Sequence, residues 1–102
     1  MRSKPLKPYV DVELVGILQK AAGTRKVRLD IRKDLEVIDL VKKLIKLYGE
    51  SLATALFNPV STDPRTNSLI LINGREITTL RGLKTLVTAG DHVVLLPISH
   101  GG

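Results

Sequence analysis

The feature that most constrains the fold is one helical pattern enclosed by strand patterns. Apolar side chains in residues 34–48 follow the three-and-four spacing of an amphipathic helix, at Ile38, Val41, Leu44, Ile45 and Tyr48. Before this segment, residues 9–16 and 25–31 alternate between apolar and polar residues, a pattern typical of half-buried strands. An amphipathic helix must bury its apolar face, so we expect it to pack on a sheet formed by these strands.

Charged residues and glycine predict the limits of this helix. Asp34 or Glu36 lies near its start, where negative charge suits the helix dipole, and Gly49 can end it. The polar face carries Lys42, Lys43 and Lys46. Such a helix is about 22 Å long, enough to cross a sheet of four or five strands.

The second half of the chain adds a short helix and further strands. In chain order we expect a helix at residues 50–57, a loop at 58–67, strands at 68–72, 75–77 and 92–96, and turns at Asn73-Gly74 and Ala89-Gly90-Asp91. If the first and last strands lie side by side in the middle, they run parallel and the helix packs across them. The predicted class is α+β, a β-grasp with a mixed sheet of four or five strands and one main helix on one face.

Composition supports one small domain with an aliphatic core. Only Tyr9, Tyr48 and Phe57 are aromatic, so Val, Leu and Ile must fill the interior. We expect a flexible lead-in at residues 1–8, the β-grasp domain at 9–97 and a flexible tail at 98–102. No apolar stretch approaches the roughly 20 residues of a membrane helix, and none has the form of a signal peptide, which predicts a cytoplasmic protein without a membrane partner.

Cysteine is absent, which excludes disulfides, thiolate metal sites and a side-chain thiol nucleophile. No residues have the spacing of a metal site or converge as an enzyme site. His92 falls in a predicted strand and His100 in the tail. Gly82-Leu83-Lys84-Thr85 lacks the glycines of a phosphate-binding loop and is interpreted as a turn, as is Asp91.

The net charge of +6 suggests acidic partners, or a solvated surface without a specific partner. The basic residues are scattered, and the three aromatic residues do not form a stacking platform on adjacent strands. These features argue against a nucleic-acid-binding function.

The tail follows the last strand directly. After Pro97 come Ile98, Ser99, His100, Gly101 and Gly102. Glycine has no Cβ, so such an end can extend into a narrow channel and approach other groups closely. A frayed terminus is the simpler explanation. The two terminal glycines are stronger evidence for a functional tail because they follow a β-grasp pattern without a linker.

Several segments resemble the small subunit of molybdopterin synthase, a ubiquitin-related sulfur carrier. They are Ala21-Ala22-Gly23, Asp39-Leu40-Val41, Ile72-Asn73-Gly74 and Ala89-Gly90-Asp91-His92-Val93-Val94-Leu95-Leu96-Pro97, with Gly101-Gly102 at the end. The ending Ile98-Ser99-His100-Gly101-Gly102 is also similar to the eukaryotic ubiquitin-related modifier and the small archaeal modifiers. The resemblance extends from Tyr9 onward and implies a ubiquitin-like β-grasp.

This resemblance implies a carrier without an active site or bound cofactor. A ubiquitin-activating-type enzyme would adenylate the Gly102 carboxylate, using ATP and magnesium that belong to that enzyme. A persulfide would then give a thiocarboxylate, which holds sulfur without cysteine, or a lysine of a target protein would attack to form an isopeptide bond. The expected partners are the activating enzyme and either a sulfur-acceptor enzyme or target lysines, and the chain is expected to be a monomer.

Two strands are apolar on both faces, although the helix can cover only one. We expect Ile70, Ile72, Val93 and Leu95 to lie under the helix. The other face would then carry Leu69, Leu71, Val94 and Leu96, the patch that binds partners in the family. A shift of one residue in register, or cover by the 58–67 loop, would remove this patch.

The ending Ser99-His100-Gly101-Gly102 favours a protein modifier or a sulfur carrier for transfer-RNA thiolation. The small subunit of molybdopterin synthase, which donates sulfur for molybdenum cofactor synthesis, is the alternative. The carrier of the thiamine pathway is usually shorter. A non-covalent β-grasp binding module is the alternative from a different class.

Overall fold

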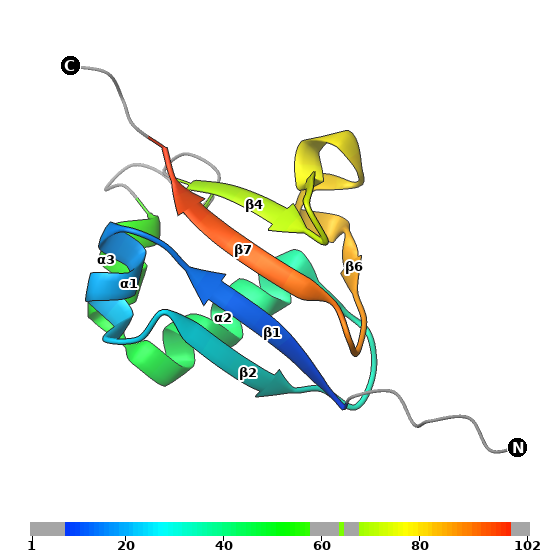
Figure 1. The fold of residues 1–102 in the computed structure, drawn as a ribbon, viewed down its shortest axis with the longest axis horizontal. Coiled ribbons are helices and arrows are strands. Elements are labelled where there is room, and N and C mark those ends of the chain that lie inside the picture. Colours follow the sequence, from blue (N-terminus) through cyan, green and yellow to red (C-terminus); the bar gives the residue numbers. More distant parts are fainter. Residues whose placement is uncertain (1–7, 58–63, 65–67, 99–102) are drawn as a thin grey trace, which may run out of the picture.

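The computed structural model describes residues 8–57, 64 and 68–98, and these form a mixed five-stranded sheet with helices on one face (Figure 1). The sheet order is β2-β1-β7-β4-β5. Its strands are β1 (Tyr9–Leu14), β2 (Lys26–Asp30), β4 (Ser68–Ile72), β5 (Arg75–Glu76) and β7 (His92–Pro97). The helices are α1 (Ile17–Ala22), α2 (Val37–Tyr48) and α3 (Glu50–Leu56), with two 3-10 turns, η2 (Ile77–Thr79) and η3 (Gly82–Lys84).

The two central strands run parallel, as the β-grasp prediction requires. β7 pairs with β1 in parallel and with β4 in the antiparallel direction. β1 and β2 form the predicted antiparallel pair, with α1 between them. Asn73 and Gly74 both have positive φ, 51° and 86°, as a two-residue hairpin turn between β4 and β5 demands. The predicted fold class is confirmed.

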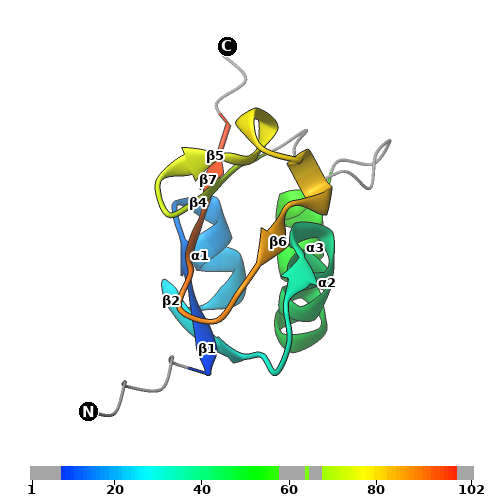
Figure 2. The same ribbon diagram turned by 90° about the vertical axis from the view of Figure 1, so that its right-hand side faces the viewer.

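Figure 2 shows the sheet nearly edge-on, with α2 and α3 on one side of it. The core lies between these layers, and every fully buried hydrophobic residue in the described part of the chain is Val, Leu or Ile. The alternation predicted for β1 and β2 is confirmed, since Val10, Val12 and Leu14 of β1 are buried, as are Val27 and Leu29 of β2.

The main helix begins later than the predicted residue 34, and its N-cap is Glu36, one of the two acidic residues expected near its start. Residues 35–36 form an extended strand, β3 (Leu35–Glu36), which pairs with β6 (Leu86–Val87) in a separate two-stranded sheet. The Val37 amide then donates to the Thr85 carbonyl at 3.0 Å, so α2 begins only at Val37. This pairing consumes backbone groups that a helix from Asp34 would have used.

The buried face of α2 also differs from the predicted one. Val37 and Leu40 are fully buried, whereas Ile38, Ile45 and Tyr48 are only half-buried at its margins. Smaller differences lie in the second half of the chain. β5 ends at Glu76, where η2 begins, and β7 continues through Pro97, which was expected to end it.

The predicted short helix at residues 50–57 is confirmed as α3, with Leu52 and Leu56 buried. α3 packs beside α1 at one end of the sheet. The predicted lead-in and the 58–67 loop lie largely outside the described residues, although Pro64 is buried and its carbonyl accepts a hydrogen bond from Ser68 Oγ at 2.8 Å. Within the described ranges, no helix is long and apolar enough to cross a membrane.

Candidate functional site

β7 is the central strand of the sheet, and the C-terminal residues follow directly after it. The Val15 amide donates to the Leu95 carbonyl at 3.2 Å on one side, and Pro97 lies opposite Ser68 of β4 on the other. Strands on both sides therefore fix β7 up to Pro97. Ile98 is half-buried and is the last described residue; the predicted tail residues Ser99, His100, Gly101 and Gly102 lie outside the described part.

Gly16 packs against this exit point. Its backbone has φ 63° and ψ −129°, a conformation open mainly to glycine. A Cβ on this residue would lie 3.0 Å from Cγ of Pro97. The glycine thus lets the β1–α1 connection approach the end of β7 closely.

We expect Gly16→Ala to lower the free energy of unfolding by about 2 to 3 kcal/mol, because it combines backbone strain with the contact to Pro97. Gly23→Ala is the matched control: Gly23 also has positive φ, 77°, but a Cβ there would meet nothing within 4 Å. It should cost about 1 kcal/mol. Urea denaturation would measure both values, and equal losses would show that Gly16 does not restrain Pro97.

Four apolar side chains share the sheet face opposite α2. In the antiparallel register of β4 and β7, Leu69 lies opposite Leu96 and Leu71 opposite Val94. Leu69 is 41% exposed and the other three are half-buried. We call these residues the apolar patch. Their sequence neighbours Ile70, Ile72, Val93 and Leu95 are buried under the helix, so the predicted assignment of faces is confirmed.

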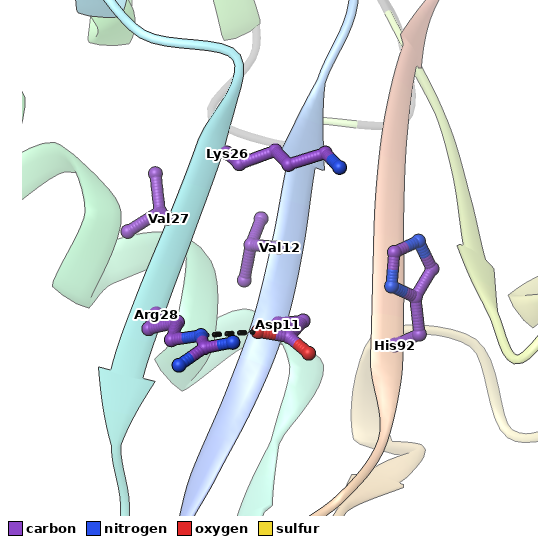
Figure 3. Close-up of a pocket in the computed structure, with 6 residues that line it drawn as sticks. All are labelled: Asp11, Val12, Lys26, Val27, Arg28 and His92. Atoms are coloured by element: carbon purple, nitrogen blue, oxygen red, sulfur yellow. Dashed lines mark hydrogen bonds and ion pairs between the residues drawn. The ribbon is translucent and has the colours of Figure 1, made fainter.

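The same open face is charged on its other half. Figure 3 shows Asp11 of β1, Lys26 and Arg28 of β2, and His92 of β7 grouped across the three strands. Arg28 Nε donates to Asp11 Oδ1 at 3.2 Å, and its guanidinium lies 4.4 Å from the centre of the Tyr9 ring. These contacts give the strands next to the apolar patch a fixed polar surface.

Glu13 links the charged half to the apolar patch. It lies opposite Val94 in the β1–β7 register, and its Oε2 accepts from Arg25 Nη2 at 2.9 Å. His92 Nε2 lies 3.6 Å from Glu13 Oε1. The hydrogen bond from Arg25, opposed by partial burial and helped by the charge of Arg25, lowers the pKa of the Glu13 carboxyl below its ordinary value. Glu13 is therefore ionised at neutral pH.

This charged half of the sheet was not predicted from the sequence. The signal was present, because Asp11 and Glu13 alternate on one strand and Lys26 and Arg28 on its hairpin partner. Register turns that alternation into cross-strand pairs, Asp11 with Arg28 and Glu13 with Lys26.

The two turns interpreted as structural prove to be so. Asp91 Oδ2 accepts from the Thr88 amide at 2.9 Å and its Oδ1 accepts from Asn73 Nδ2 at 3.0 Å, which joins two loops. Lys84 is exposed at the end of η3. Among the described residues, no group of three or more His, Cys, Asp or Glu side chains could hold a metal ion.

The fold of this chain is found in several known proteins. The structure is similar to the small archaeal modifier protein 1 from Methanosarcina acetivorans, with 32% identity over 97% of this chain and 100% of that chain and a TM-score of 0.73. The chain belongs to the ubiquitin-like family of small modifiers and sulfur carriers. The crystal structure of small archaeal modifier protein 1 from Haloferax volcanii is similar at 26% identity, over 92% of this chain and 99% of that chain, with a TM-score of 0.76.

Members of this ubiquitin-like family are small carrier proteins without catalytic activity. The fold is also shared with a chain of the BexX/CysO complex from Amycolatopsis orientalis, at 19% identity over 91% of this chain and 99% of that chain, with a TM-score of 0.70. No family model matches the sequence, and no curated protein is significantly similar to it.

A charge placed in the apolar patch should weaken partner binding and leave the fold intact. Leu69→Glu should change the free energy of unfolding by less than about 1 kcal/mol, because Leu69 is already 41% exposed. It should reduce activation of the chain end about tenfold, if the patch is the contact on which that step depends. The matched control is Leu86→Glu, because Leu86 is 57% exposed on β6, outside the five-stranded sheet. Equal activation of both variants would show that the apolar patch is not part of the docking surface.

Proposed function

We propose that this chain is a protein modifier or sulfur carrier of the ubiquitin-like family, and that its reactive group is the carboxylate of Gly102. The observation that carries the proposal is the position of β7. This strand is held between β1 and β4 and leads out of the sheet at Pro97, beside the apolar patch. A partner that docks on the patch therefore has the end of the chain within reach.

The proposed chemistry begins with adenylation. A carboxylate resists nucleophilic attack because of its charge and resonance, whereas an acyl-adenylate has a good leaving group. An activating enzyme would supply the site, ATP and magnesium. The carboxylate oxygen attacks the α-phosphorus of ATP and releases pyrophosphate. The outer sulfur of a persulfide then displaces AMP to give an acyl disulfide, and a second thiol of the sulfur donor cleaves its S–S bond, which leaves a thiocarboxylate on the chain and a disulfide on the donor, as for transfer-RNA thiolation. Alternatively, a target lysine displaces AMP to form an isopeptide bond.

The similarity to two small archaeal modifier proteins, at 32% and 26% identity, supports the modifier branch over the molybdopterin branch. The BexX/CysO complex, which holds a chain of this fold beside another protein, supports docking of a protein partner on this fold.

Trapping with hydroxylamine would test the activation step. The chain is incubated with an extract of its own cells, ATP, magnesium and hydroxylamine, which attacks the acyl-adenylate to give a C-terminal hydroxamate and AMP. We expect mass spectrometry to find the hydroxamate on Gly102 only when ATP is present. An equal yield without ATP, or a hydroxamate on side-chain carboxyls alone, would contradict the proposal.

A further inference from the structure

β2 forms one edge of the sheet, and its outward backbone groups can be identified. At one end, the Leu14 amide donates to the Arg25 carbonyl at 2.7 Å, and at the other the Ile31 amide donates to the Pro8 carbonyl at 3.0 Å. In an antiparallel pair, every second residue directs its backbone N–H and C=O groups toward the neighbouring strand. The odd-numbered residues from 25 to 31 therefore direct these groups toward β1. The backbone N–H and C=O groups of Arg28 and Asp30 consequently point away from the sheet.

In the part of the chain that the structure describes, no strand pairs with β2 on its outer side. Figure 1 shows β2 at the margin of the sheet, with α2 passing behind it. An edge strand with free N–H and C=O groups is a template for another strand. Proteins that bind peptides by strand addition use such an edge next to a pocket for alternate side chains.

A groove between β2 and α2 supplies such a pocket. It has a volume of about 430 Å³ and is lined by Leu29, Asp30, Lys43, Lys46 and Leu47. Leu47 is 60% exposed, whereas Leu40 and Leu44 of the same helix are fully buried. Leu47 is therefore a leucine of α2 that faces the sheet edge and is not part of the core.

The charges around this groove define its occupant. Lys43 and Lys46 line it beside the single acid Asp30, and the adjoining hollow at the end of β2 adds Arg32, Lys33 and Asp34. Cations therefore outnumber acids by four to two along the two hollows. On the open face of the same strand, Lys26 and Arg28 are also exposed, with Arg28 paired to Asp11 and Lys26 without an ion pair to any described residue at 4.0 Å or less. This excess favours an acidic ligand.

We propose that the β2–α2 groove binds an extended acidic peptide segment of a partner protein, which adds to the sheet as a strand beside β2. Side chains alternate in a strand, so every second residue of the peptide faces Leu29 and Leu47 and should be apolar. The intervening residues face Lys26 and Arg28 and should be Asp or Glu. A second copy of this chain would bring the same excess of cations to the edge, which disfavours it as the occupant.

This contact is non-covalent and independent of Gly102, so it goes beyond the proposed function. It would let the body of the modifier be recognised after its terminus is attached to another protein. A variant that lacks Gly101 and Gly102 should bind the peptide as well as the full chain does, which separates failure of this inference from failure of the proposed function.

Titration of the isotope-labelled full chain with a capped peptide, Glu-Val-Glu-Val-Glu-Val, followed by NMR, tests the inference. We expect the largest amide shifts at Arg28 and Asp30 of β2 and at Lys43 and Leu47 of α2. Leu47→Glu and Lys43→Glu should each weaken binding about tenfold, since each adds an acid against the acidic peptide. The matched control Leu86→Glu should bind as the wild type does.

Two control peptides separate the contributions of charge and of strand pairing. The same sequence with Lys in place of Glu should not bind, because its charges match those of the groove. The Glu peptide with every amide N-methylated should lose binding, because it can donate no hydrogen bond to the edge of β2. The inference is overturned by absence of shifts at β2, by shifts centred on the apolar patch, by equal binding of the Lys peptide, or by self-association through β2.

Discussion

Removal of Gly102, or addition of residues after it, should abolish ATP-dependent activation and leave the fold unchanged. The activating site must align the carboxylate with the α-phosphorus of ATP, and a displaced or missing reacting group costs about 100-fold or more in rate. We expect the hydroxamate yield to fall at least that far for both variants. Their midpoints of thermal unfolding should match the wild type, because residues 99–102 follow the last strand and Pro97 is the last residue that the sheet pairs.

The matched control is a substitution in the tail that keeps its length and its terminal glycines. Ser99→Ala preserves Gly101-Gly102 and should retain most of the activation. Full activation of an extended and uncleaved chain would be incompatible with a reactive Gly102 carboxylate. Loss of activation in Ser99→Ala alone would show that activation depends on Ser99 and not on the two terminal glycines.

Two neighbouring leucines of β7 should respond in opposite ways to the same change. Leu95 is fully buried in the core, so Leu95→Ala should lower the free energy of unfolding by about 3 kcal/mol through lost burial and a cavity. In a domain of this size, that loss lowers the unfolding temperature by about 10 to 20 °C. Leu96 is only half-buried on the open face, and Leu96→Ala should cost less than about 1 kcal/mol.

Activation should show the reverse order once both variants are assayed folded, at low temperature. Leu96→Ala should lose activation because it removes part of the apolar patch, while Leu95→Ala should retain it. Calorimetry and hydroxylamine trapping measure the two effects. A slip of one residue in register exchanges the faces of a strand, so destabilisation by Leu96→Ala in place of Leu95→Ala would refute the orientation of β7.

The strands and the layer order followed from the sequence because period-two alternation marks a strand that is buried on one side. Val10, Val12 and Leu14 illustrate this, since each is buried and each alternates with a half-exposed residue. The apolar runs of β4 and β7 were harder, because both faces are apolar. The expectation that a helix covers only one face of the sheet separated the two sets of residues, and Ile70 and Leu95 are indeed fully buried in the core.

The start of α2 could not be predicted because its competitor is distant in sequence. β3 and β6 contribute two residues each, too few for any periodic pattern, and they meet only when the fold brings Leu35 to Val87. Local charge allowed a start near Asp34 or Glu36, and the β3–β6 pairing selects the later one, with Glu36 as the N-cap. The groove beside β2 likewise depends on where α2 lies, so Leu47 could not be distinguished from a core leucine by spacing alone.

Mass spectrometry of the untagged protein isolated from its own cells tests the central claim most directly. We predict that part of the chain carries a thiocarboxylate on Gly102, heavier by the difference between sulfur and oxygen, or that lysines of other proteins carry Gly-Gly remnants with this chain attached. The first product indicates sulfur transfer and the second conjugation. An unmodified Gly102 throughout, with no remnant on any lysine under conditions in which the protein is needed, would contradict the assignment of function to this terminus.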